Sequence, residues 1–261
     1  MLEILSERDT IFMDGTFFVC PSLWLQVYTI HCLVDGKMFP VAFSLLPNKT
    51  KQTYVRLFTL LKDVVGARTG VDLSPDIIQT DYEAAVISAI SDVFPASSVR
   101  GCFFHYAQAL WRLVVDRGLS RDYTDNPAVQ THIRRAAALP LLPLAEVQDA
   151  WIEVMEQGPD GQQIIRFNDD VTSTWVDFNA TFLRALWNQH ENTDPCSNNH
   201  LEGFHNGLKK RMLRAHPNIF QFVKELKKIE TADRRSRRQI GLGGAMRPRA
   251  RVDRDRDARI D

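Results

Sequence analysis

The sequence is poor in cysteine and has neither a long apolar run nor an internal repeat. Its four cysteines, Cys20, Cys32, Cys102 and Cys196, are widely spread and lack the spacing of a disulfide-stapled secreted domain, so we expect reduced thiols in an intracellular protein. No apolar stretch reaches the roughly 18 residues of a membrane-spanning helix. We therefore expect no membrane partner. The first ten residues, MLEILSERDT, are too short and too charged for a signal peptide, which argues against secretion.

The chain also lacks net charge, but the zero total hides an uneven distribution. Residues 1–207 contain 15 basic and 25 acidic side chains, whereas residues 208–261 contain 17 and 7. The C-terminal arm is therefore strongly basic, which suits contact with nucleic acid, with another anionic partner or with solvent. With 44% hydrophobic and 25% charged residues, the 261-residue chain has a globular composition and is long enough for one large domain or two small ones.

Patterns of apolar residues predict a mixed α/β fold. Residues 9–19, 23–34 and 35–47 are rich in β-branched and aromatic residues, and Asp35-Gly36 is a strong hairpin signal, so these segments predict an antiparallel meander. Further along, the patterns predict a helix over 50–67, a strand over 76–81, a helix over 82–95, a strand over 97–106 and a helix over 107–118. This order indicates a mixed sheet with helices on its faces.

The second half of the chain reads as helical. Residues 127–140, 143–157 and 174–188 predict helices without a competing strand pattern, so we interpret 121–195 as a helical insertion. Another helix begins near 197–199, and an amphipathic helix follows in the basic arm. We expect residues 1–120 to form the core with residues 196–232 completing it, and residues 233–261 to be a basic tail, disordered beyond about 240.

Two carboxylates interrupt apolar strands. Asp14 lies near the end of the first predicted strand, and Asp81 ends the strand of residues 76–81. If these strands are neighbours, the carboxylates face one another, and a divalent cation such as Mg²⁺ or Mn²⁺ would offset their repulsion. The alternative is structural, because Asp14-Gly15 could form a turn and Asp81 could cap the next helix.

A third group of polar residues occurs late in the chain. Glu202 is expected in the first turn of a helix, with His205 and Asn206 one turn further on the same face. Lys209, Lys210 and Arg211 follow and suit phosphate contacts. The structural alternative is that Glu202 only favours the positive end of its helix and that His205 is an ordinary partly buried histidine.

The segments FMDGTF, IIQTDYEAAV, GCFFHYAQALWR and SNNHLEGFHNGLKKR, in this order and spacing, resemble the transposase domain of Mutator-like elements. That family belongs to the ribonuclease-H-like DDE transposases. The resemblance implies a ribonuclease-H-like α/β fold with an all-helical insertion before the last catalytic helix. It also implies that Asp14, Asp81 and Glu202 form an acidic triad that holds two Mg²⁺ or Mn²⁺ ions.

The resemblance implies metal-dependent DNA cleavage and strand transfer, with DNA as the partner and a homo-oligomer as the working form. One alternative is a domesticated or truncated derivative, a nuclear DNA-binding or regulatory protein without transposition. A second is an acid-lined nuclease acting on RNA or hybrids. Family members usually carry a DNA-binding region upstream, whereas only about eight residues precede the first strand here. We therefore expect a missing N-terminal region, or recognition by another chain or by the basic arm.

The family's Cys-x-x-His signature maps onto Cys102 and His105. These residues could supply two zinc ligands, with Cys196, His200 or His205 completing four, but we do not expect zinc. The alternatives place Cys102 in the sheet and His105 at the active-site crevice, at DNA or at a helix cap. In the arm, a cluster made by Arg234, Arg235, Arg237 and Arg238 suits phosphate contacts or nuclear import, so we expect a nuclear protein.

Overall fold

The computed structural model describes residues 1–192, 199–212 and 214–243, and the chain divides into two compact units, Met1–Asn218 and Ile219–Asp261. The strands are β1 (Thr10–Thr16), β2 (Gln26–Val34), β3 (Lys37–Leu46), β4 (Ile77–Thr80) and β5 (Ser98–Gly101). The helices are the 3₁₀ segments η1 (Leu2–Glu7) and η2 (Leu139–Leu141), the π-helix η3 (Thr172–Val176), and α1 (Lys51–Thr69), α2 (Ala84–Val93), α3 (Phe103–Asp116), α4 (Ser120–Asp125), α5 (Pro127–Ala138), α6 (Val147–Glu156), α7 (Gln162–Val171), α8 (Arg184–Trp187), α9 (Asn199–Met212) and α10 (Ile219–Gly241).

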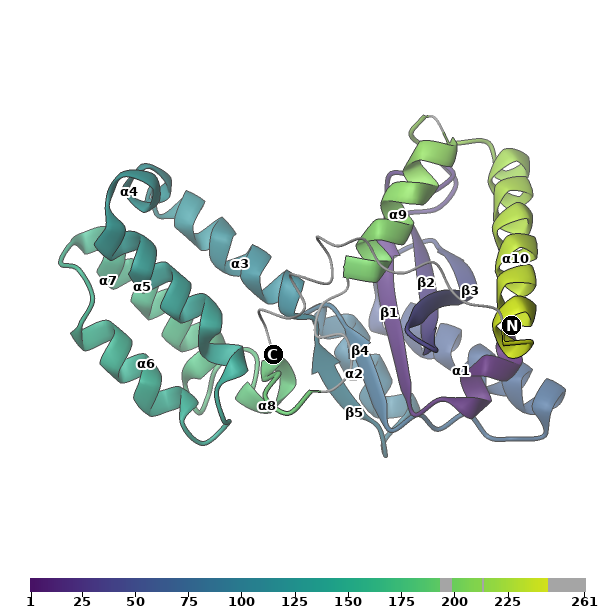
Figure 1. Ribbon diagram of the computed structural model, residues 1–261, viewed down its shortest axis with the longest axis horizontal. Helices are drawn as coiled ribbons and strands as arrows, with labels where there is room; N and C mark the ends of the chain where they lie inside the picture. Colours follow the sequence, from purple (N-terminus) through teal and green to yellow (C-terminus); the bar gives the residue numbers. More distant parts are fainter. Residues whose placement is uncertain (193–198, 213, 244–261) are drawn as a thin grey trace. The chain divides into compact units, whose positions relative to one another are not determined.

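The five strands form one mixed sheet in the order β3-β2-β1-β4-β5 (Figure 1). The first three strands are antiparallel neighbours, and β4 runs parallel to both β1 and β5. Asp35 and Gly36 both have positive φ angles, as a two-residue β2–β3 hairpin requires. The predicted α/β class and meander are confirmed, and the strand order is compatible with the expected ribonuclease-H-like sheet.

Alternating side chains of β2 bind the sheet to helices on its two faces. Tyr28 packs edge-on against Tyr54 of α1, with ring centroids 5.3 Å apart. Its neighbour Thr29 points to the opposite face, where its hydroxyl lies 3.2 Å from the His205 ring of α9. The sheet is thus covered by α1 on one side and by α9 on the other.

Helix α1 has well-defined ends. The Thr50 hydroxyl accepts a hydrogen bond from the Thr53 amide at its N-terminus, and Gly70 ends the helix in the left-handed region with φ 72°. The predicted apolar face is buried at Tyr54, Phe58, Leu61 and Val65, whereas Leu57 is only half-buried. Among the described residues, no helix has the length and apolar character to cross a membrane.

The helices from α3 to α8 have a hydrophobic core of their own. Tyr106, Trp151, Trp175 and Trp187 are its largest buried side chains, and the Tyr106 and Trp187 rings stack 5.3 Å apart. After α8 the chain returns to the sheet, because Gln189 donates a 2.7 Å hydrogen bond to the Gly101 carbonyl at the end of β5. This hydrogen bond places the chain beside the sheet before α9 begins.

Three local expectations from the sequence are wrong. The strand predicted over 97–106 ends at Gly101, and α3 begins at Phe103. Residues 174–188 are not one helix but contain the end of η3, a loop and the single-turn α8. The apolar residues of this segment pack into the core of the helical part although their backbone is irregular. Their spacing along the sequence resembles that of a helix, which explains the wrong prediction. The third concerns Trp111, whose helical spacing with other apolar residues predicts core packing, but whose side chain is 45% exposed.

Candidate active site

Asp14 lies inside β1, the middle strand of the sheet, and its side chain is almost fully buried. It stands opposite Thr29 of β2, so both side chains project to the face covered by α9. On its other side β1 pairs in parallel with β4, with Phe12 level with Gln79. Two residues further along come Asp14 in β1 and Asp81 directly after β4, and the negative charge of Asp81 acts on the Asp14 carboxyl group. That the two carboxylates face one another stays a prediction.

The alternative of an Asp14-Gly15 turn does not apply, because both residues belong to β1 and pair with β2. Gly15 is nevertheless needed at this position. A β-carbon there would lie 2.5 Å from the buried Gln26 side-chain oxygen. The Gly15 amide also donates a 2.8 Å hydrogen bond to Asp14 Oδ1, which fixes one oxygen of the carboxyl group.

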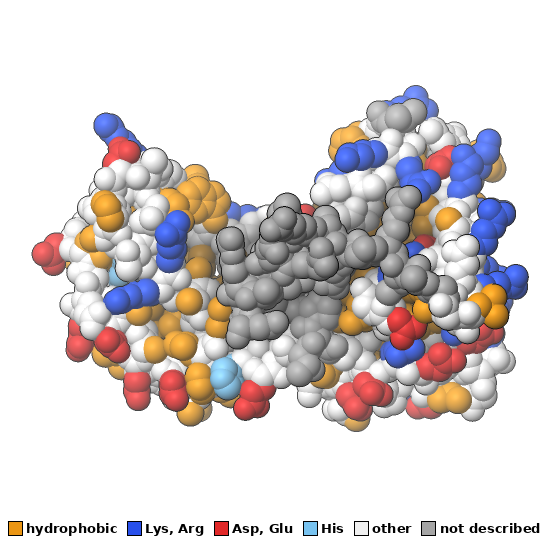
Figure 2. Space-filling view, in the orientation of Figure 1, with side chains coloured by type: hydrophobic (Ala, Val, Ile, Leu, Met, Phe, Trp, Pro, Cys, Tyr) orange, Lys and Arg blue, Asp and Glu red, His pale blue; other side chains and the backbone are white. Residues whose placement is uncertain are grey.

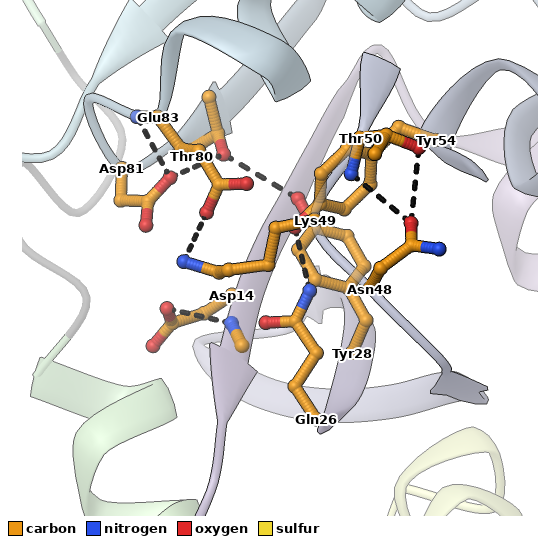
Figure 3. Close-up of polar contacts among 11 residues, drawn as sticks. Asp14, Gln26, Tyr28, Asn48, Lys49, Thr50, Tyr54, Thr80, Asp81 and Glu83 are labelled. Atoms are coloured by element: carbon orange, nitrogen blue, oxygen red, sulfur yellow. Dashed lines mark hydrogen bonds and ion pairs between the residues drawn. The ribbon is translucent and has the colours of Figure 1, made fainter. Parts of the chain in front are cut away.

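Asp81 follows β4 directly. Its Oδ1 accepts a 3.2 Å hydrogen bond from the Glu83 amide, in the turn that leads into α2. The capping alternative is wrong, because Glu83 and not Asp81 is the N-cap of α2. Asp81 Oδ2 takes no part in the bond to the Glu83 amide. Figure 3 shows Lys49 extending between Asp14 and the Asp81–Glu83 turn, where its Nζ forms a 2.5 Å ion pair with Glu83.

Glu202 lies in the first turn of α9, on a helix held to the sheet by its neighbours. The Phe204 ring packs edge-on against His31 of β2, with centroids 5.0 Å apart, and His205 contacts both Thr29 and Asp14. These contacts carry Glu202 to the face of the sheet where Asp14 projects. Glu202 and Asp14 line the same pocket of about 350 Å³.

The charges of Asp81 and Glu202 act on the Asp14 carboxyl group. The pKa of Asp14 is raised to about 8, first by burial and then by the negative charge of Asp81 and, to a smaller extent, of Glu202. The Gly15 hydrogen bond and the positive charge of Lys49 oppose this rise. Asp14 is therefore protonated at neutral pH unless a cation compensates the negative charge around it.

His205 and Thr29 complete a short hydrogen-bonded chain around Asp14. The Thr29 hydroxyl donates to the Asp14 carbonyl oxygen at 3.1 Å, so it must accept from His205 Nε2–H at 3.2 Å. This tautomer leaves the lone pair of Nδ1 facing Asp14 Oδ2 at 3.4 Å. Burial lowers the pKa of His205 to about 4 and raises the pKa of Asp14 to about 8, so in both groups it favours the uncharged form.

Of the Cys-x-x-His pair, only His105 faces the acids. His105 lines the pocket, and its pKa is lowered by burial although Asp81 and Glu202 act in the opposite direction. Cys102 is a fully buried, reduced cysteine directly before α3. Cys196 and the His200 side chain lie outside the described residues, so the four-ligand zinc set is not tested.

Within the described part of the chain, no three His, Cys, Asp or Glu side chains are close enough together to hold one metal ion. The donor chemistry nevertheless suits a divalent cation, because Asp14, Asp81 and Glu202 offer hard oxygen ligands and raise the energy of the ionised Asp14 when no cation is present. Asp14, Asp81 and Glu202 come from three segments that are distant in sequence, so the fold is needed to bring them toward one region.

The basic candidates occupy two helices. On α9, Lys209 lines the pocket, and Lys210 and Arg211 are exposed beyond it. On α10, Lys and Arg side chains follow one another along the helix (Figure 2). Arg235 and Arg238 are exposed and Arg237 is half-buried, while Arg234 forms a 2.6 Å ion pair with Glu230.

Two residues beside the candidate site, Lys49 and Thr29, were not predicted from the sequence. Lys49 has no motif around it and reaches the acids only through the loop between β3 and α1. Thr29 could have been found from the hairpin, because once β1 and β2 are paired it is the residue opposite Asp14.

Comparison with known proteins agrees with the resemblance stated above. Residues 10–109 match the family model of the MULE transposase domain. The chain is also 30% identical over 100 residues, or 38% of its length, to the PKS-NRPS hybrid synthetase cheA of Chaetomium globosum. Because that match spans only 2% of the synthetase, synthetase activity has no support here. The segment that matches the family model contains Asp14, Asp81, Cys102 and His105, so this part of the chain is similar to a MULE transposase domain.

Proposed function

We propose that this chain is the catalytic part of a DDE-type transposase that cleaves DNA strands and joins the ends to new sites. The observation that carries the proposal is the burial of Asp14 in the middle of the sheet, where its pKa is raised first by this burial and then by the charges of two further acids from distant segments. A buried carboxyl group with like charges around it destabilises the fold, and such groups are typical of functional sites.

Asp14, Asp81 and Glu202 would hold two Mg²⁺ or Mn²⁺ ions. Ions held by these residues would supply activation of the attacking water or hydroxyl and charge stabilisation at the leaving oxygen. The Gly15 amide orients Asp14, and the Glu83 amide orients Asp81. His205 lies within reach of the Asp14 proton, which has to leave when the carboxyl group ionises. Lys209, at the edge of the pocket, suits a phosphate of the DNA backbone.

The wider setting is part of the same proposal. A transposase acts on two DNA ends, which favours a homo-oligomer, and an additional DNA-binding region would supply end recognition. The basic face of α10 suits DNA backbone contacts or nuclear import, so a nuclear location is proposed. The domesticated alternative predicts DNA binding without cleavage.

The first test is cleavage of supercoiled plasmid by the purified chain in Mg²⁺ or Mn²⁺. We expect nicking by the wild type and a loss of at least about a hundredfold in Asp14→Asn and Glu202→Gln, because each change removes a charged ligand while keeping side-chain size. Asp160→Asn, which alters an exposed acid in the helical part, is the matched control and should cleave normally.

Circular dichroism must first show that each variant is folded. Equal nicking by wild type and a folded Asp14→Asn protein would refute the assignment of the triad. DNA binding without nicking by the wild type, in either metal, would instead support the domesticated derivative.

A further inference from the structure

Two phenylalanines directly after β1 are exposed at the edge of the acidic pocket. Phe17 is 46% exposed and Phe18 is 43% exposed, and both line the pocket together with Asp14 and Glu202. A single exposed aromatic residue is common on protein surfaces. Two adjacent ones beside a candidate active site present a continuous apolar face to whatever enters the pocket.

The loop that carries these rings is firmly held. The next two residues, Val19 and Cys20, are fully buried and anchor the loop. The Cys20 amide donates to the Phe17 carbonyl, and the His216 amide donates to the Phe18 carbonyl, both at 3.0 Å. The His216 ring adds a 3.0 Å hydrogen bond to the Cys20 carbonyl. The exposed rings therefore sit on a backbone fixed from two sides, so little conformational entropy is lost when a ligand binds.

Each ring also has a lysine over its face. Lys49 Nζ lies 5.1 Å from the centroid of Phe17, and Lys209 Nζ lies 5.9 Å from that of Phe18. Both distances are within the range of cation–π attraction. Lys49 is paired with Glu83 and acts as a fixed positive charge, whereas Lys209 is exposed and can contact an anion. Aromatic faces with adjacent cations match a ligand that has flat rings and phosphates.

We propose that Phe17 and Phe18 form a stacking platform for an unpaired nucleobase next to the phosphate that is cut, with Lys209 on a flanking phosphate. This platform rests on the proposed function, since the acidic pocket is taken as the place where DNA lies. A base within a duplex is stacked on its neighbours and cannot reach the rings, so the bound DNA has at least one base out of its pair at this point. An apolar protein surface, such as a second copy of the chain, fits poorly because cations border both rings.

The test measures DNA binding in the Asp14→Asn background, so that no strand is cut during the measurement. Fluorescence anisotropy compares a short single-stranded oligonucleotide with a blunt duplex of the same sequence. We expect Phe17→Ala combined with Phe18→Ala to weaken single-strand binding about tenfold, because base–aromatic stacking is lost. Duplex binding should change by less than about twofold, since it depends mainly on phosphate contacts.

Two further variants make the result specific. Phe17→Trp combined with Phe18→Trp keeps flat aromatic faces and should retain single-strand binding. Phe178→Ala removes a phenylalanine that is 84% exposed but does not line the pocket, and it should leave both affinities unchanged. The fluorescence of a 2-aminopurine placed in the single strand should change when the background protein binds, because the base leaves its neighbouring bases for the rings. With the double alanine variant this change should be absent.

The outcomes separate this proposal from the proposed function. Unchanged single-strand affinity in the double alanine variant overturns the platform, and so does an equal loss for single strand and duplex. A change in oligomeric state without a change in DNA binding identifies the patch as a contact between copies and also overturns it. If the wild-type chain never nicks plasmid but the stacking signals are present, the platform stands and the transposase activity falls.

Discussion

His31 on β2 is a fully buried histidine beneath α9, and no described residue offers either of its ring nitrogens a hydrogen bond. Its ring packs edge-on against Phe204, the contact that holds Glu202's helix on the sheet. Burial, with a smaller contribution from His205, lowers the pKa of His31 to about 3. Below pH 6.5 the unfolded chain binds a proton at this position and the folded chain does not, so stability must fall as the pH falls.

From this shift we expect the free energy of unfolding of the wild type to fall by about 2 kcal/mol between pH 7 and pH 5 because of His31. His31→Leu keeps an apolar side chain of similar size and should lose that part of the pH dependence. Urea unfolding at both pH values measures the difference. His190→Leu changes an exposed histidine and should follow the wild type. The same pH slope in His31→Leu and wild type would contradict the buried neutral state.

At the scale of elements, close packing decides how helices and strands meet near the site. Gly101 ends β5, and a β-carbon there would collide with the ring of Tyr82. Tyr82 cannot easily move away, because it packs edge-on against Trp175 and Phe182 with centroids 4.9 Å and 5.1 Å distant. This junction joins the sheet to the core of the helical part and holds the segment that leads on to α9.

We therefore expect Gly101→Ala to lower the free energy of unfolding by about 1–3 kcal/mol through overpacking. Gly207→Ala is the matched control, since Gly207 lies within α9 with no neighbour near its missing β-carbon. That change should stabilise the protein by about 0.5–1 kcal/mol, because alanine favours a helix more than glycine does. Chemical unfolding of both variants tests the pair, and a Gly101→Ala protein as stable as wild type would show that the Tyr82 junction is loose.

For the whole molecule, the separation of charge is the main long-range feature. The first 207 residues carry a net charge of −10 and the last 54 a net charge of +10, so the acids gather in the first part and the cations near the C-terminus. A basic surface binds the DNA backbone by releasing counterions, and each contact adds to the salt dependence of binding. The basic C-terminal arm should therefore determine the overall affinity for DNA, and the acidic pocket should determine the reaction.

Changing Arg234, Arg235, Arg237 and Arg238 together to glutamine tests this division. We expect weaker binding to duplexes of every sequence and a salt slope smaller by about 2–4. Arg234 should contribute least because it is paired with Glu230. Arg121→Gln, which alters an exposed arginine of the helical part, should leave the slope unchanged. An unaltered slope in the quadruple variant would exclude the arm as a DNA contact.

The sequence by itself determined the order of the main strands and helices and the hairpin at Asp35-Gly36, because alternation, helical periodicity and turn chemistry are local properties. It also indicated the acids Asp14, Asp81 and Glu202 by their positions at strand ends and on a helix. Only the tertiary structure decided that β1 and β4 are neighbours, that Asp14 is an interior strand residue and that Lys49 and Thr29 reach it. It also decided where irregular backbone replaces the helix expected over 174–188. These features depend on contacts between segments far apart along the chain, whose energies come from burial and close packing and leave no local pattern in the sequence.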